Sequence, residues 1–185
     1  MANSVENVYS SALLELLEEQ HGNNKAGFAE ALSELGAVND VFDAAPEIFG
    51  FSLVPTVSRE DKISVIKNVF ADKVSPFTLN FLCVLTEKKR LPRFGNIYRD
   101  FRGKYYEKFG IAPVTVTSAF ALSAEQKQKI TAKMAQITGK EVELSEKTDK
   151  SVIGGIVVDY GSSRLDGSVK NRLDSLRKEI ADTVL

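Results

Sequence analysis

Few side chains in this sequence could carry out acid–base, nucleophilic or metal chemistry. The 185 residues contain one histidine, His21, and one cysteine, Cys83. Zinc sites built on several His or Cys ligands, and triads built on a histidine, are therefore poorly supported, and His21 lies in the polar stretch EEQHGNN. We predict that His21 lies on the surface at a helix end, that no metal or cofactor is bound, and that the protein is not an enzyme.

The cysteine and two aspartates have structural interpretations. Cys83 lies in the apolar run FTLNFLCVL, which is typical of a buried thiol in a reducing compartment. Asp159 and Asp166 flank a turn and could be imagined as an acid–base pair. Because turns and helix caps recruit aspartate for local hydrogen bonds, we interpret both as structural residues.

The stretch VIGGIVVDYGSSRLDGSVKNRLDSL, residues 152–176, raises the question of a phosphate-binding loop. Such a loop places glycines between a strand and a helix, where backbone amides converge on the phosphates. Here Gly154 and Gly155 precede the main apolar run, and no lysine follows at P-loop spacing. We interpret them as glycines inside a strand, 152–160, at a point where another backbone must approach closely.

The composition is that of a soluble globular protein, with 43% hydrophobic and 26% charged residues. No apolar run approaches the roughly 20 residues that cross a bilayer. The first 20 residues contain four acids and no Lys or Arg, which argues against a signal peptide or an organellar presequence.

Up to residue 109, every signal is helical. Apolar residues recur at helical spacing, a short helix is expected at 46–51, and Pro76 and Pro92 suit the first turns of helices. Ser58 with Asp61 resembles a capping box. We predict an all-α bundle of about six helices over residues 1–109.

Beyond a junction at 109–113, strands and helices alternate. The first strand places four residues on one face, and the next helix begins at Ser123 and ends at Gly139, before the alternating strand KEVELSE. Asp166 or Ser168 caps the last helix. The four residues on one strand face are Val114, Val116, Ser118 and Phe120, and the apolar stripe of the last helix is Val169, Leu173, Leu176 and Ile180. Residues 113–185 are thus predicted to form a small α/β domain, and the whole chain is α+β.

The net charge of −1 conceals an uneven distribution. Residues 1–60 carry 10 acids and 2 bases, whereas 61–112 carry 5 and 11. The segment from Lys88 to Lys108 holds eight Lys or Arg interleaved with aromatics, which suits nucleic-acid binding, and this remains the alternative function. The aromatic residues recur at spacings of four, three and four, which instead favours one buried helix face, a core stripe. They are Phe94, Tyr98, Phe101 and Tyr105.

Two predicted helices hold more apolar surface than a small bundle needs. In PFTLNFLCVL apolar residues occur on every side, and Leu14 widens the stripe of the first helix. Either the helix from Pro76 is central to the bundle, or a partner helix lies in a groove between these two helices. The sequence leaves both possibilities open.

Together these features resemble the δ subunit family of bacterial F-type ATP synthase, which includes the mitochondrial oligomycin-sensitivity-conferring protein. The similarity covers essentially the whole chain and is most specific in residues 152–176, with a glycine pair, a strand, Asp-Gly-Ser-Val and a leucine-spaced helix. Further similar segments are VYSSALLELL, SREDKISVIKNVF, FLCVLTEKKRLPRF and VTVTSAFALSAEQKQKI. TEKKRL departs from the pattern, because the family more often has a glycine before the arginine.

The resemblance implies a non-catalytic stator subunit without cofactors. Residues 1–109 would bind the N-terminal segments of α subunits on the catalytic head, and residues 113–185 the end of the membrane-anchored b subunits. The subunit would resist rotor torque during proton-driven ATP synthesis. It would lie at the cytoplasmic face of the bacterial cell membrane, meet the membrane only through the complex, and bind no nucleic acid.

The resemblance also implies roles for particular positions. One α segment would lie as a helix against the first and fifth helices, at Tyr9, Ala12, Leu13, Asn80, Phe81 and Val84. The signature residues of the C-terminal domain would be structural, and they are Gly154, Gly155, Asp166, Gly167 and Ser168.

Overall fold

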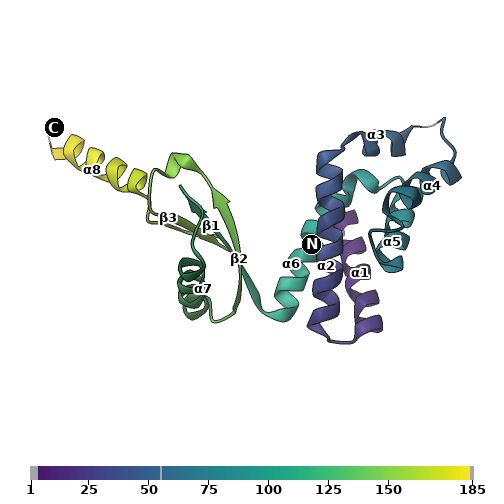
Figure 1. Cartoon of the computed structure of the whole chain (residues 1–185), viewed down its shortest axis with the longest axis horizontal. Coiled ribbons are helices and arrows are strands. Elements are labelled where there is room, and N and C mark those ends of the chain that lie inside the picture. The colour runs from purple at the N-terminus through teal and green to yellow at the C-terminus, as the bar shows by residue number, and fades with distance from the viewer. Residues whose placement is uncertain (1–3, 55, 184–185) are drawn as a thin grey trace. The chain divides into compact units, whose positions relative to one another are not determined.

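The structure is a computed structural model that describes residues 4–54 and 56–183 (Figure 1). Its contacts divide the chain into two compact units, Met1–Tyr105 and Tyr106–Leu185. The division lies before the junction expected at 109–113. The reason is that Tyr106 already packs with the second unit, where its side chain is buried and its hydroxyl donates to the Glu143 carboxylate at 2.9 Å.

The N-terminal unit is built from helices joined by short connections, as the sequence predicts (Figure 1). Four of these helices begin at a polar side chain that accepts a hydrogen bond from a backbone N–H of the first turn, namely Ser4, Asn24, Ser58 and Ser75. The elements are α1 (Val5–His21), α2 (Lys25–Ala44), α3 (Glu47–Leu53), α4 (Arg59–Phe70), α5 (Pro76–Glu87), the 3₁₀ turn η1 (Leu91–Arg93) and α6 (Phe94–Phe109).

The core of this unit is rich in phenylalanine. The Phe42 ring lies edge-on to Phe70 and Phe94, with ring centroids 5.6 and 5.2 Å apart. Phe94, Phe101 and Tyr105 are buried, which confirms three of the four positions of the core stripe predicted for the basic segment, whereas Tyr98 is only half-buried. Rings packed inside a bundle present no faces for stacking against bases, so the main support for the nucleic-acid alternative is lost.

The C-terminal unit is a four-stranded mixed sheet with helices (Figure 1). The strand order is β2-β1-β3-β4, with β2 parallel to β1 and both β1–β3 and β3–β4 antiparallel. The core of the sheet and α7 is formed by Val114, Val116, Met134 and Val158. The elements are β1 (Ile111–Ser118), α7 (Ala124–Thr138), β2 (Glu141–Thr148), the 3₁₀ turn η2 (Lys150–Val152), β3 (Ile156–Tyr160), β4 (Ser163–Asp166) and α8 (Val169–Thr183).

Two sequence-based expectations for this unit are wrong in detail, and one strand has no counterpart in the prediction. The strand predicted over 152–160 begins only at Ile156, because Ile153 and Gly155 have positive φ angles (66° and 76°) that extended pairing does not allow. Phe120 lies beyond the end of β1 and is 77% exposed. The strand β4 was not predicted, because all of its residues are exposed and it lacks a buried face.

The glycine pair therefore precedes β3, but the predicted close approach of another backbone is confirmed. A Cβ atom on Gly155 would lie 2.3 Å from the carbonyl oxygen of Gly167. The Gly167 N–H donates to the Ile156 carbonyl at 3.0 Å, and the Val169 N–H donates to the Gly154 carbonyl at 3.0 Å. These backbone N–H groups are occupied within the protein, so the corner is a packing feature and not a phosphate cradle.

The other signature residues start α8. The Asp166 carboxylate accepts from the Ser168 N–H at 2.9 Å, and the Ser168 hydroxyl accepts from the Asn171 N–H at 3.1 Å. Hydrogen bonds with Ser168 lower the pKa of Asp166. Both residues proposed from the sequence thus contribute to the helix start, Ser168 as the N-cap and Asp166 as the turn before it.

Gly155→Ala should lower the free energy of unfolding of the C-terminal unit by about 2–4 kcal/mol, since it combines a left-handed φ with a backbone clash. Urea unfolding followed at the amide NMR signals of this unit measures the effect. Gly161→Ala is the matched control, because its φ is 57° but nothing lies within 4 Å of its Cβ position. Gly161→Ala should lower the free energy of unfolding by only about 1 kcal/mol. Equal losses would show that contact with Gly167 is not the constraint.

Candidate protein-docking groove

The described surface of the helical unit has a groove of about 460 Å³ between α1 and α5. All six positions implied by the resemblance line it. Four further residues also line the groove and were not expected. Two of them could have been found from helical spacing, because Leu16 follows Leu13 by three residues and Phe77 precedes Phe81 by four. The lining residues are Tyr9, Ala12, Leu13, Leu16, Gln20, Pro76, Phe77, Asn80, Phe81 and Val84.

The groove has a buried floor and an exposed apolar rim. Leu13 is buried, whereas Leu16 and Val84 are 49% and 43% exposed. The Tyr9 and Phe81 rings meet edge-to-face across it, with centroids 6.3 Å apart. The two faces of α5 therefore differ: Leu82 and Leu85 face the bundle, while Phe81 and Val84 line the groove. Within this chain the helix is not covered on all sides, which favours the partner-helix alternative.

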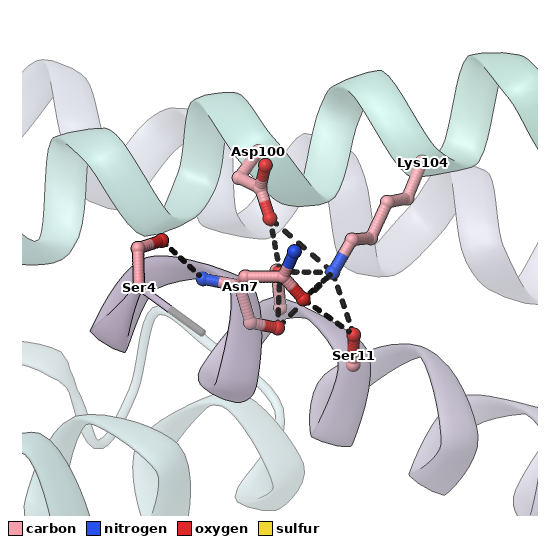
Figure 2. Close-up of polar contacts among 6 residues, drawn as sticks. Ser4, Asn7, Ser11, Asp100 and Lys104 are labelled. Atoms are coloured by element: carbon pink, nitrogen blue, oxygen red, sulfur yellow. Dashed lines mark hydrogen bonds and ion pairs between the residues drawn. The ribbon is translucent and has the colours of Figure 1, made fainter. Parts of the chain in front are cut away.

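A polar cluster holds the opposite face of α1 against α6 (Figure 2). The Ser10 side chain is fully buried, and its hydroxyl donates to the Asp100 carboxylate. The Lys104 ammonium lies 3.3 Å from the same carboxylate, and it donates to the Ser10 and Ser11 hydroxyls at 2.7 and 2.6 Å and to the Asn7 carbonyl at 3.0 Å. Sequence reasoning missed this cluster, whose only signal was serine within an apolar helix.

The start of α5 is fixed by a carboxylate from α2. Glu34 accepts hydrogen bonds from the Ser75 N–H at 3.1 Å, the Ser75 hydroxyl at 2.6 Å and the Thr78 hydroxyl at 2.7 Å. Burial acts to raise the pKa of Glu34, but the hydrogen bonds from Ser75 and Thr78 outweigh it and leave that pKa lowered. Because Ser75 is also the N-cap of α5, this contact sets where Pro76 and Phe77 enter the groove.

The end of α5 lies in the segment TEKKRL, residues 86–91, which departs from the family pattern. Lys89, which stands where a glycine was expected, has a left-handed φ of 56°. Its N–H donates to the Thr86 carbonyl at 3.0 Å, and the next N–H, of Arg90, donates to Leu85 at 2.8 Å. The chain reversal brings the Arg90 guanidinium over the Tyr9 ring, 5.3 Å from its centroid, with one N–H 3.3 Å from the Tyr9 hydroxyl.

The residues first considered for chemistry do not line the groove between α1 and α5. His21 is exposed at the last residue of α1, as predicted. Cys83 is half-buried, and burial raises the pKa of its thiol. Asp159 lies in β3, with its carboxylate 3.3 Å from the Arg164 guanidinium, and Asp166 begins the turn into α8. Each aspartate therefore has a structural partner.

Lys89→Gly should raise the free energy of unfolding of the helical unit by about 1 kcal/mol, because glycine adopts a left-handed φ without steric cost. Urea unfolding followed at the NMR signals of this unit tests it. The matched control is Lys88→Gly, since Lys88 has φ −81° and gains nothing from glycine. That variant should be destabilised by about 0.5–1 kcal/mol. Stabilisation by both substitutions, or by neither, would contradict the assignment of strain to Lys89.

Glu34→Gln should reduce stability at neutral pH and change the acid limb of the stability profile. A lowered folded-state pKa means that the Glu34 contribution is fully present above the unfolded value near 4.5 and is lost as the pH falls through the folded value. The stability gap between the two proteins should therefore narrow as the pH falls below about 4.5. Glu30→Gln, which removes an exposed carboxylate with no hydrogen bond in the described chain, should leave the stability at neutral pH unchanged.

Comparison with known proteins agrees with this architecture. A family profile described as ATP synthase delta (OSCP) subunit matches residues 5–180. ATP synthase subunit delta of Prochlorococcus marinus strain MIT 9312 is 34% identical over 177 residues, covering 95% of this chain and 96% of that protein. The chloroplastic subunit of Galdieria sulphuraria is 31% identical over 167 residues, covering 90% and 92%.

A solved structure shows the same fold. A chain in the cryo-EM structure of the Toxoplasma gondii mitochondrial ATP synthase hexamer matches with a TM-score of 0.69 at 23% identity, over 97% of this chain and 98% of that chain. In the described part of this chain, no helix is long and apolar enough to cross a membrane. From the full-length match, the chain belongs to the ATP synthase δ (OSCP) subunit family, whose members are non-catalytic components of the peripheral stalk of F-type ATP synthase.

Proposed function

We propose that this subunit links the catalytic head of the synthase to the membrane-anchored b subunits, and that its α1–α5 groove binds the N-terminal helical segment of an α subunit. The observation that carries this proposal is that all six positions expected to contact that segment line one groove. In this role the subunit lies at the cytoplasmic face of a bacterial membrane and holds the head still against rotor torque during proton-driven synthesis.

The groove has the shape and chemistry that an amphipathic helix requires. From Tyr9 to Gln20 it follows 12 residues of α1, a rise of about 17 Å, which matches three turns of a docked helix. Burying three or four apolar side chains at about 1.5–3 kcal/mol each can sustain nanomolar affinity after ordering costs. Gln20 and Asn80 offer amide groups beside the apolar surface.

The C-terminal unit is assigned to the b subunits. Supporting this assignment, Val169 and Leu173 lie one helical turn apart on α8 and are 43% and 54% exposed. The rest of the predicted stripe, Leu176 and Ile180, falls outside the side chains that the structure describes. A second amphipathic helix packed along α8 would cover this face, as helices do in two-stranded contacts.

Val84→Asp should weaken binding of an α-subunit peptide at least about 30-fold, because it leaves a charge unpaired in an apolar contact. The measurement is calorimetric titration of the full chain with a synthetic peptide matching about 22 residues, or six turns, of the α-subunit N-terminus.

The matched control is Val65→Asp, a change of the same kind on α4, where Val65 is 36% exposed and outside the groove. Its affinity should equal that of the unchanged protein, and circular dichroism should show both variants folded. Equal affinity for Val84→Asp would remove Val84 from the interface. A folded protein that fails to bind the peptide at micromolar concentration would contradict the proposed docking itself.

A further inference from the structure

The docking groove continues past its apolar part toward α2. At Gln20, Pro76 and Phe77 it meets a second hollow of about 350 Å³, which shares those three residues. This extension is more polar in its side chains, with His21, Glu30 and Glu34 among its lining residues. The groove therefore ends in a different chemical environment from the one in which it begins.

The end near α2 is acidic. Glu30 is exposed and has no ion-pair or hydrogen-bond partner in the described chain. The Glu34 carboxylate is held by Ser75 and Thr78, whose hydrogen bonds favour its charged form. Two negative charges thus border the extension.

The other end is basic. The Arg90 guanidinium is stacked over Tyr9 and hydrogen-bonded to its hydroxyl, but no carboxylate of the described chain forms an ion pair with it. Its neighbour Arg93 differs in this respect, because its guanidinium lies 2.7 Å from the Glu6 carboxylate. Exposed Lys89 adds positive charge beside Arg90, whereas the Lys88 ammonium lies 3.9 Å from the Glu87 carboxylate.

We propose that these opposite charges orient the helix that docks in the groove. The Lys- or Arg-rich end of the segment lies against Glu30 and Glu34, and its acidic end lies against Arg90. This inference rests on the proposed docking and adds its polarity. A reversed helix would bury the same apolar side chains but place like charges together at both ends, which is how interfaces reject wrong registers.

The size of the preference follows from exposed charge pairs. Each pair at an open rim is worth about a two- to fivefold change in affinity. Since reversal exchanges attraction for repulsion at two places, the correct orientation should be favoured about tenfold or more at low salt. High salt should reduce this preference, because both ends are open to solvent.

The test uses the full chain and two synthetic amphipathic peptides with one apolar stripe. One peptide carries Lys at its N-terminal end and Glu at its C-terminal end, and its twin carries the reverse. A nitroxide attached through a thioether to the N-terminus of each peptide broadens nearby amide NMR signals of the protein. For the first peptide we expect broadening at Gln20 and Phe77, and for its twin at Tyr9 and Val84.

A broadening pattern that is the same for both peptides would overturn the polarity while leaving the docking intact, because chain direction would then be set by apolar shape alone. Failure of both peptides to bind a folded chain would overturn the docking and the polarity together. The double variant Glu30→Lys with Arg90→Glu keeps the net charge but brings both ends close to neutral, because Glu34 and Lys89 remain. It should therefore abolish the difference between the two patterns. Glu60→Lys, an exposed charge change on α4, should leave them unchanged.

Discussion

The attachment of α1 to α6 is the contact on which the candidate site depends. A buried serine hydroxyl, a carboxylate and an ammonium group satisfy one another on one face of α1, where Ser10, Asp100 and Lys104 meet. Buried polar groups are costly unless they are paired, so this network permits few other rotations of the helix. With that face committed to α6, the opposite face, with Leu13 and Leu16, borders the groove.

Helix α5, which forms the second wall of the groove, is fixed at each end by a different contact. Glu34 of α2 fixes the start of α5 through Ser75 and Thr78, and the left-handed turn at Lys89 fixes its end. The apolar rim between these ends is left open because the inward residues Leu82 and Leu85 already fill the bundle. The exposed apolar side chains on this helix, which is fixed at both ends, form the surface on which the proposed docking rests.

The C-terminal unit solves a different problem, which is the entry of α8 beside the sheet. The backbone at Gly155 and Gly167 approaches too closely for any side chain, and the neighbouring N–H groups bond to carbonyls of the same corner. Glycine is needed at Gly155 both for space and for its positive φ. The residues that suggested a phosphate loop thus form a backbone-to-backbone contact, in which the N–H groups of Gly154, Gly167 and Val169 already donate to carbonyls.

Local periodicity and local hydrogen bonds in the sequence determined the helices, the caps at Ser58, Ser123 and Ser168, and the α+β order. The positions of α1 and α5 that line the groove came instead from the resemblance to the family. Tertiary structure decided which face of α5 is buried, how Ser10 meets Lys104, and that residues 163–166 form a strand. It also decided that Phe120 lies outside β1 and that Gly155 precedes β3. These depend on partners far away in the chain: a polar edge strand is recognisable only by its pairing, and a helix face is buried only when another element lies against it.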